Sequence, residues 1–373
     1  MGKKFFAILI MLIMLLVAFS GYIAAAEASV EEKEVIKWDM ASTWTSTYLP
    51  VEGDKYWADQ VGKMSGGRFQ VTHYPAGALM GAFEVFDAVS MGTPQCAGEF
   101  PGYWVGKNTA FDILASVPSY FTWPDWMLWY FEGGGKELYD EIYGKYNLKH
   151  LPLMQVTIEQ GLQSNKPIRG LEDLKGLKVR VGTLTLMDLI KNVGGEAMQL
   201  PGGDTYEAMM RGTIDAFEVG PFSVNYALGL HEVAKYTIVP AWWQPNTING
   251  IIINRDEWNK LPDDLKAIAE NASLASLSVI SPWAAMKDAE ALKAVQDYGV
   301  EVIQFPPEDI ARIQEIVAKS LAANAEKNPD FKKVLVSQMK YLKKFEDMRE
   351  ISSPFGWGLN PYFYPELAEL AEE

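Results

Sequence analysis

The stretch GLEDLKGLKVRVG, residues 170–182, contains a turn or short helix, then LKG, and then a β-strand. Leu177, Val179 and Val181 alternate along this strand and therefore share one face, whereas Arg180 points to the opposite face. A lone arginine in the middle of a strand either faces solvent or lies at the bottom of a cleft, where it can bind an anion. The residues alone leave both alternatives open.

Strands and helices alternate on both sides of this stretch. The expected strands cover residues 35–42, 68–75, 177–182, 197–201 and 214–220, and the expected helices cover 49–67, 83–92, 185–195 and 204–212. Asp204 and Glu207 match a capping box at the start of the last of these helices. The alternation favours parallel sheets covered by helices, and two such units in one chain imply a cleft between them where a small ligand binds.

The C-terminal part of the chain is mainly helical. We expect one or two long helices within 255–299, a strand over 299–306, a helix over 306–327 and an amphipathic, aromatic-rich tail. The sequence therefore predicts an α/β fold of two lobes, each a mixed, mostly parallel sheet flanked by helices, with long helices at the C-terminus. The expected boundaries are 34–158 for the first part of lobe I, 159–248 for lobe II, 249–320 for a return to lobe I with connecting helices, and 321–373 for a C-terminal helical extension.

Residues 1–26 have the pattern of a secretory signal peptide. Two lysines precede a short apolar run over 5–19, and small residues follow it. The run is too short to span a bilayer comfortably, which favours cleavage after Ala26 or Ala28 over an uncleaved membrane anchor. We therefore expect the mature protein outside the cytoplasm.

The composition narrows the classes of function. Among 373 residues, 48 are acidic and 33 are Lys or Arg, and the resulting formal net charge of −15 argues against a nucleic-acid partner. The single cysteine, Cys96, leaves no intrachain disulfide, and the three histidines show no metal-ligand spacing. No phosphate-binding loop, nucleophile elbow or zinc-protease motif occurs. An exported chain of this kind favours binding over catalysis.

Several segments resemble a known family. SNKPIRGLEDLKGLKVRVG at 164–182 and MSGGRFQVTHYPAGALMGAFEVFDAVSMG at 64–92 resemble the periplasmic solute-binding proteins of TRAP transporters, the DctP-like proteins. PGYWVGK, LPGGDTYEAMMRGTIDAFEVGP and LHEVAKYTIVPAWWQP resemble a branch that binds 2-oxo or 2-hydroxy carboxylates, in some members with a metal ion. The resemblance covers about residues 36 to 320 and implies the two-lobed fold of a periplasmic binding protein.

The resemblance implies roles for individual residues. Arg180 matches the arginine of the family's DLKGLK-x-R motif. In the family, this arginine binds the ligand carboxylate through two charge-assisted hydrogen bonds. A second polar contact is expected at Gln160, and a glutamate that helps to bind ligand and metal is expected at Glu218, followed by Val219. Gln160, Glu218 and Gln244 are therefore the expected metal ligands, since their oxygens suit a hard cation such as Ca²⁺ or Na⁺ that bridges ligand and protein.

The chain departs from this branch at two places. Val219 stands where the branch usually has tryptophan, and GLQSN replaces an aromatic GGWF run. A buried glutamate beside a carboxylate ligand repels it unless a cation or a proton lies between them. Glu218 therefore either contributes to a metal site or points away from the ligand.

Aromatic residues complete the expected site. Tyr103 and Trp104 either wall the cleft or pack in the core. Trp243 is expected to cover the ligand, and Trp44 lies at the end of the first strand, where α/β sheets present their binding loops.

The function implied by the resemblance is capture of a small organic acid in the periplasm, with no chemical step, and its delivery to the membrane permease of a TRAP transporter. Some relatives dimerise through the C-terminal region, so a homodimer is expected. Two alternatives stay open. One is an extracytoplasmic enzyme that acts on a carboxylated substrate with Glu218 as its general base. The other is a free-standing sensor of the same ligand.

Overall fold

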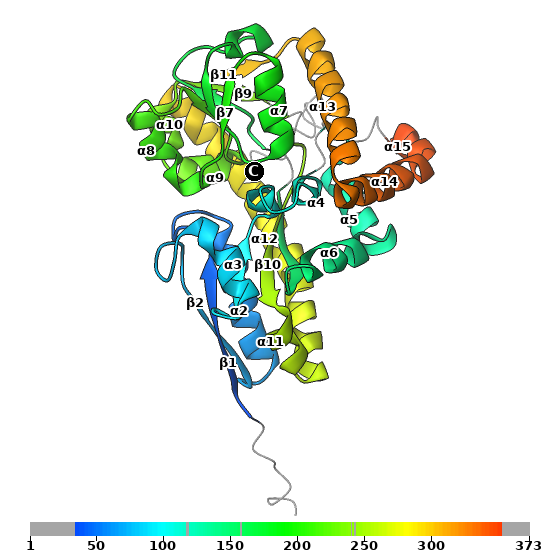
Figure 1. The fold of residues 1–373 in the computed structure, drawn as a ribbon. Helices are drawn as coiled ribbons and strands as arrows, with labels where there is room; N and C mark the ends of the chain where they lie inside the picture. Colours follow the sequence, from blue (N-terminus) through cyan, green and yellow to red (C-terminus); the bar gives the residue numbers. More distant parts are fainter. Residues whose placement is uncertain (1–33, 117–118, 157–158, 240, 242–243, 353–373) are drawn as a thin grey trace, which may run out of the picture.

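The computed structural model describes residues 34–116, 119–156, 159–239, 241 and 244–352. Its strands form two separate sheets with helices packed around both (Figure 1). We call the part built on the first sheet the first lobe and the part built on the second sheet the second lobe. The expected signal peptide lies outside the described residues, and none of the described helices is long and apolar enough to cross a membrane.

The first sheet has the strand order β2-β1-β3-β10-β4. β1 runs parallel to β2 and β3, whereas β10 runs antiparallel to β3 and β4. Every residue of β10 is buried, as expected for a strand between two neighbours whose faces are both covered. The strands are β1 Ile36–Ser42, β2 Phe69–His73, β3 Cys96–Glu99, β4 Leu148–Val156 and β10 Thr247–Asn254.

The second sheet has the order β11-β9-β5-β8-β6-β7 and contains the strand of Arg180. β6 runs parallel to β7 and β8, and β9 runs parallel to β11. β5 is antiparallel to both of its neighbours, so this sheet is mixed as well. The strands are β5 Gln163–Ser164, β6 Lys178–Arg180, β7 Glu196–Met198, β8 Ala216–Phe217, β9 Tyr236–Val239 and β11 Glu301–Gln304.

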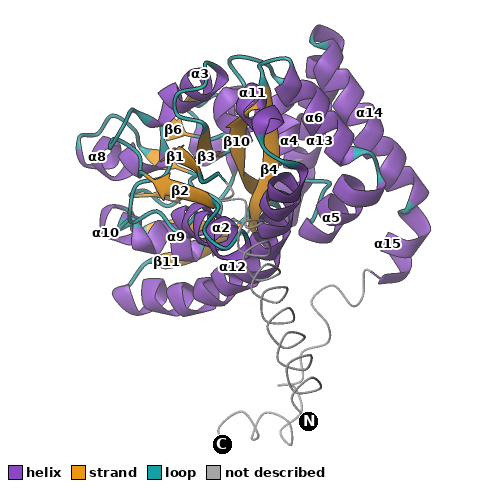
Figure 2. Cartoon of the chain, turned by 90° about the horizontal axis from the view of Figure 1, so that it is seen from below, coloured by secondary structure: helices purple, strands orange, loops and turns teal. Residues whose placement is uncertain are grey.

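Helices surround the strands of both sheets (Figure 2). The α-helices are α2 Val51–Met64, α3 Val85–Ser90, α4 Ala110–Ala115, α5 Trp123–Glu132, α6 Gly135–Gly144, α7 Leu184–Asn192, α8 Thr205–Met210, α9 Phe222–Ala227, α10 Leu230–Val233, α11 Arg255–Lys260, α12 Asp263–Tyr298, α13 Pro307–Lys327, α14 Pro329–Lys344 and α15 Glu346–Ser352. The 3₁₀-helices are η1 Ala82–Glu84, η2 Pro101–Trp104, η3 Leu171–Leu174 and η4 Gly202–Asp204.

The 36-residue helix α12 packs against both lobes. In its first half, the Ala269 carbonyl accepts a hydrogen bond of 3.0 Å from Trp57 Nε1 of α2, in the first lobe. In its second half, Asp288 Oδ1 accepts one of 2.9 Å from the Ser223 amide at the start of α9, in the second lobe. Pro282 lies inside the helix between these two contacts.

The structure confirms the predicted two-lobed α/β fold and the long C-terminal helices. The capping-box prediction is wrong, because Asp204 lies in η4 and its side chain makes no capping hydrogen bond to α8. The lobe boundaries stay predictions, with one difference from the expected pattern. β11, which falls in the range 249–320 expected to return to lobe I, pairs with β9 of the second sheet.

Gly161 sits between the end of β4 and β5, where the chain passes from the first sheet to the second. Its φ of +96° lies in the region that favours glycine, and a Cβ added there would lie 2.2 Å from the backbone carbonyl oxygen of Ile238 in β9. The same glycine follows two buried polar residues, Glu159 and Gln160. A side chain at position 161 would therefore disturb both strand β9 and those two residues.

We expect Gly161→Ala to lower the free energy of unfolding by more than about 3 kcal/mol, because backbone strain adds to a backbone clash. Gly212→Ala is the matched control, since Gly212 has a φ of +68° but no atom within 4 Å of the added Cβ. The control should lose only about 1 kcal/mol. Urea denaturation measures both, and equal losses would contradict the role of the close approach at Gly161.

Candidate ligand-binding site

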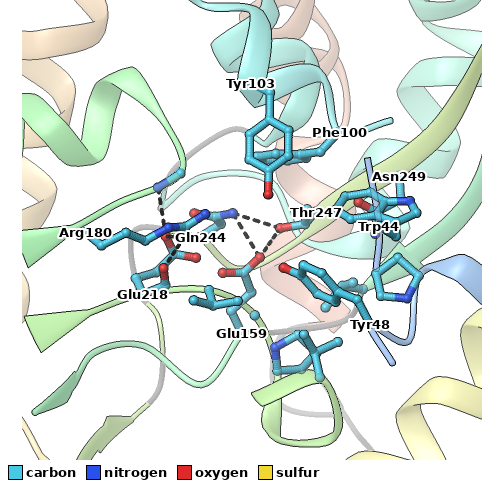
Figure 3. Close-up of a pocket in the computed structure, with 17 residues that line it drawn as sticks. Trp44, Tyr48, Phe100, Tyr103, Glu159, Arg180, Glu218, Gln244, Thr247 and Asn249 are labelled. Carbon is cyan, nitrogen blue, oxygen red and sulfur yellow. Dashed lines mark hydrogen bonds and ion pairs between the residues drawn. The ribbon is translucent and has the colours of Figure 1, made fainter. Parts of the chain in front are cut away.

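A small cavity lies where the two lobes meet (Figure 3). The cavity is small, with a volume of about 30 Å³ open to the centre of a water molecule. The walls come from both lobes and from the segments that connect them. The lining residues are Trp44, Tyr48, Pro50, Phe100, Tyr103, Val156, Glu159, Arg180, Gly182, Glu218, Val219, Gly220, Pro221, Val224, Gln244, Thr247 and Asn249.

Arg180 projects from β6 into this cavity and is only 2% exposed, which excludes the solvent-facing alternative. Its Nε donates to the Leu200 carbonyl at 3.1 Å, and its Nη1 donates to the backbone carbonyl of Glu218. Within the described part of the chain, Nη2 makes no hydrogen bond. Two of the three guanidinium nitrogens are therefore held by backbone carbonyls, while Nη2 stays available for a ligand.

Glu218 follows β8 and is 1% exposed. Its Oε2 lies 3.4 Å from Arg180 Nη1 and accepts a hydrogen bond of 3.0 Å from the Gly182 amide. Glu218 therefore turns towards the cavity, and the alternative in which it points away is wrong. Val219 lines the cavity beside it.

A second buried carboxyl group, Glu159, was not predicted. It is 4% exposed, and its Oε1 accepts hydrogen bonds from Thr247 Oγ1 at 2.6 Å and Gln244 Nε2 at 2.9 Å (Figure 3). Burial, together with the nearby Glu218 carboxylate, raises the pKa of Glu159 well above its usual range. The available signal was that Glu159 is the single charged residue between 151 and 165, in a segment that otherwise reads as core.

Oxygen atoms in this cluster fit a hard cation. Glu159 Oε2 and Gln244 Oε1 are both buried without a hydrogen-bond partner among the described residues. Together with the Glu218 carboxylate they offer two carboxylates and one amide oxygen, the ligands that Ca²⁺ prefers and that Na⁺ also accepts. No cluster of three or more His, Cys, Asp or Glu side chains suited to a metal occurs in the described ranges, so the cation would need ligand oxygens as well.

Aromatic residues of the first lobe supply hydrogen-bond donors. Burial raises the pKa of both Tyr48 and Tyr103, so both hydroxyls keep their protons. The Tyr103 oxygen accepts a hydrogen bond of 3.0 Å from the Gly202 amide, and its hydroxyl points towards the polar side chains of the cavity (Figure 3). The buried Trp44 Nε1 has no hydrogen-bond partner among the described residues.

The other expected residues lie elsewhere. Gln160 does not line the cavity, since its amide donates to Thr237 Oγ1 at 2.7 Å and accepts from Asn225 Nδ2 at 2.8 Å. Trp104, the last residue of η2, is buried and donates to Glu99 Oε2 at 2.6 Å, which is its core-packing alternative. Trp243 lies outside the described residues.

A contact between the lobes fixes the segment that follows Arg180. Asp112 of α4 accepts hydrogen bonds from the Leu184 amide at 2.6 Å and the Thr185 amide at 3.2 Å, at the start of α7. Asp112 thus caps a helix of the second lobe from the first lobe. Although these bonds favour the carboxylate, complete burial outweighs them and raises the pKa of Asp112 to about 6.

Comparison with known proteins identifies the family. Residues 40–328 match the family described as bacterial extracellular solute-binding protein, family 7, also called DctP. The chain belongs to this family. A monocarboxylate 2-oxoacid-binding periplasmic protein of Nostoc is 31% identical over 301 residues, which are 80% of this chain and 82% of the relative.

Solved DctP-family structures share the fold. A TRAP transporter solute-binding protein of Bordetella bronchiseptica has a TM-score of 0.84 at 26% identity, over 90% of this chain and 99% of its own. The site of that protein holds copurified calcium and picolinate, and the protein is described as a dimer. A protein of Pseudoalteromonas atlantica with bound sodium and pyruvate has a TM-score of 0.81 at 27% identity, over 86% and 98% of the two chains. One of Colwellia psychrerythraea with calcium and pyruvate has a TM-score of 0.81 at 26% identity, with the same coverage.

We expect the buried Asp112 to make stability depend on pH. Its folded pKa of about 6 lies above the usual unfolded value of about 3.9, so the folded state binds the proton more tightly. The contribution of Asp112 to stability is therefore largest below about pH 4 and is lost as the pH rises through 6, by about 3 kcal/mol at most.

Urea denaturation of wild type and Asp112→Asn between pH 4 and 7 measures this contribution. The wild type should lose more stability with rising pH than the variant does. Asp297→Asn, at an exposed position of α12, is the control and should follow the wild type. Parallel curves for wild type and Asp112→Asn would contradict the expectation.

Proposed function

We propose that this DctP-family protein captures a small 2-oxo monocarboxylate in the cavity between its lobes, with Arg180 bound to the ligand carboxylate. The observation that carries the proposal is the buried guanidinium whose Nη2 is left without a partner among the described residues while Nε and Nη1 are fixed by backbone carbonyls. A planar guanidinium held in this way is pre-organised to bind a carboxylate.

The hydrogen-bonding groups around Arg180 favour a 2-oxo acid over a 2-hydroxy acid. Tyr48, Tyr103 and Trp44 offer donors to the cavity. A 2-oxo acid has only acceptor oxygens, which match those donors, whereas a hydroxyl would bring a donor of its own that competes with the cation for Glu159 Oε2 and Gln244 Oε1. The small volume also suits a ligand with few non-hydrogen atoms, such as the pyruvate of two similar structures.

A bound cation would balance the buried charge. Arg180 and Glu218 neutralise each other, so a ligand carboxylate adds one uncompensated negative charge to a site that excludes water. Na⁺ removes this excess if Glu159 keeps its proton, and Ca²⁺ removes it if Glu159 is ionised. Either cation would be held by Glu159, Glu218 and Gln244, whose oxygens are available to it. When bound, the cation would polarise and fix the ligand oxygens.

Delivery to a TRAP membrane permease from the periplasm, after removal of the signal peptide, completes the proposed function. The family and the relatives support this delivery. A homodimer formed through the C-terminal region 321–373 stays a prediction. A carrier releases its ligand chemically unchanged, whereas an enzyme with Glu218 as general base would convert it. Recovery of unaltered pyruvate after long incubation and denaturation would therefore speak for the carrier.

Arg180→Lys should weaken pyruvate binding by at least about tenfold, because an ammonium group lacks the fixed planar geometry with which the guanidinium bonds two backbone carbonyls and still presents a donor to the ligand carboxylate. Lysine keeps the positive charge, so Glu218 is not left as an unpaired buried anion. Isothermal titration calorimetry with pyruvate and with lactate, its 2-hydroxy counterpart, measures the effect. The wild type should bind pyruvate more tightly than lactate.

Arg211→Lys is the matched control, since Arg211 forms an exposed ion pair on α8 and should bind pyruvate like the wild type. Unchanged affinity of Arg180→Lys would overturn the carboxylate contact. A wild type that binds none of pyruvate, lactate and picolinate would overturn the proposed ligand class.

Removal of the cation should weaken pyruvate binding as well. We expect a chelator to reduce the ligand-induced rise in melting temperature, and Ca²⁺ or Na⁺ to restore it. Glu218→Gln removes one charge from the cation's surroundings and should weaken Ca²⁺ binding, measured by calorimetry with saturating pyruvate, by at least about tenfold. Glu207→Gln on the exposed face of α8 serves as the control. A ligand-induced rise in melting temperature that chelator and added ions leave unchanged would contradict the proposed cation.

A further inference from the structure

Beside the cavity, backbone and side chains of the two lobes approach each other closely. We call this set of contacts the seam. It is formed by Thr45, Tyr48, Gly102 and Tyr103 of the first lobe and by Gln199, Gly202 and Gly203 of the second lobe. None of these contacts lies within a single sheet, so each of them depends on the lobes being together.

Gln199 is the side chain that spans the seam. It follows β7 and is half-buried. Its Nε2 donates to the Gly102 carbonyl of the first lobe at 2.9 Å and to the Gly182 carbonyl of the second lobe at 2.9 Å. A primary amide carries two N–H groups, so one side chain can satisfy both acceptors at once.

The two acceptors of Gln199 belong to the walls of the ligand cavity. Gly102 precedes Tyr103 in η2, and Gly182 comes two residues after Arg180 and donates its own amide to Glu218. The bond on one side thus holds the tyrosine of the first lobe. The bond on the other side holds the backbone that places the Arg180–Glu218 pair.

Glycines allow the lobes to come this close. A Cβ added at Gly202 would lie 2.5 Å from the Tyr48 hydroxyl of the opposite lobe, and one added at Gly203 would lie 3.0 Å from Thr45 Cγ2. Neither glycine has a positive φ, so an alanine would suit the backbone and would meet an obstacle only across the seam.

We propose that Gln199 is a positioning residue that latches the two lobes together over the bound ligand, through its paired hydrogen bonds to Gly102 and Gly182. The inference rests on the proposed capture of a ligand between the lobes. The latch forms only when the lobes have closed. It therefore slows the escape of the ligand and leaves its entry unchanged.

The first test is the kinetics of pyruvate binding by stopped flow. Gln199→Met keeps the length of the side chain and removes both donors, so the dissociation rate should rise by about two- to tenfold with an unchanged association rate. Gln70→Met is the matched control, since Gln70 also donates to a glycine carbonyl, that of Gly67, but within one lobe. The control should keep the dissociation rate of the wild type. An unchanged dissociation rate in Gln199→Met would overturn the latch.

The second test needs no ligand. Spin labels at Met91→Cys and Met210→Cys report the distance between the lobes, because both positions are exposed, at 81% and 66%, and the native Cys96 is buried. Electron–electron distance measurements should show a smaller closed population in Gln199→Met than in the wild type. Gly202→Ala, which obstructs closure sterically, should act in the same direction, and Gln70→Met should not.

These tests separate the two proposals. If the wild type binds no carboxylate but Gln199→Met still depletes the closed population, the ligand class fails and the latch stands. If the wild type binds pyruvate and Gln199→Met leaves both the dissociation rate and the closed population unchanged, the latch alone fails. A fall in melting temperature without a change in closure would assign Gln199 a purely structural role and would also overturn the latch.

Discussion

The structure depends on how three ionisable groups, Arg180, Glu218 and Glu159, are buried together where the lobes meet. Charges taken out of water are costly unless they are paired and hydrogen-bonded. Here the guanidinium is held by two backbone carbonyls, and each carboxyl group accepts bonds from the chain around it. The Arg180 side chain is thus held in place by its own lobe, which lowers the cost of ordering it when a ligand binds.

Both sheets contribute to this site because the chain crosses between them more than once. β6 and the end of β8 bring Arg180 and Glu218 from the second sheet. The segment after β4 brings Glu159, and β10 brings Thr247 back to it from the far side. Segments that are far apart in the sequence therefore enclose the cavity. Its polar groups form one network only when the lobes are together.

The sequence predicted the parts of this arrangement that follow local rules. Period-two alternation placed Arg180 on the face opposite Val179, and glycine stops marked the helices around it. A family motif then supplied its role. Glu159 was not predicted as a site residue, because burial of a charge depends on partners such as Thr247 that are distant in the chain. Gln160 was expected in its place, one residue away, and a shift of one residue in an extended segment moves a side chain to the other face.

The roles of the aromatic residues also depend on contacts that local sequence patterns do not encode. Tyr103 and Trp104 are adjacent and chemically similar, yet one lines the cavity and the other bonds Glu99 inside the first lobe. Only the direction of η2 separates their roles, and no local pattern encodes that direction. The lobe contacts of Gln199 were likewise invisible, since a half-buried glutamine after a short strand has no distinguishing sequence signal.

The long helix α12 has a mechanical consequence. The Ser281 hydroxyl accepts a hydrogen bond from the Gln155 amide of the first lobe, and Asp288 accepts one from the Ser223 amide of the second lobe. Opening the lobes must therefore bend the helix between these points, where Pro282 lacks the amide hydrogen that would stiffen the turn. α12 thus joins the lobes as one continuous helix with a weakened turn, so a relative motion of the lobes would be taken up by bending near Pro282.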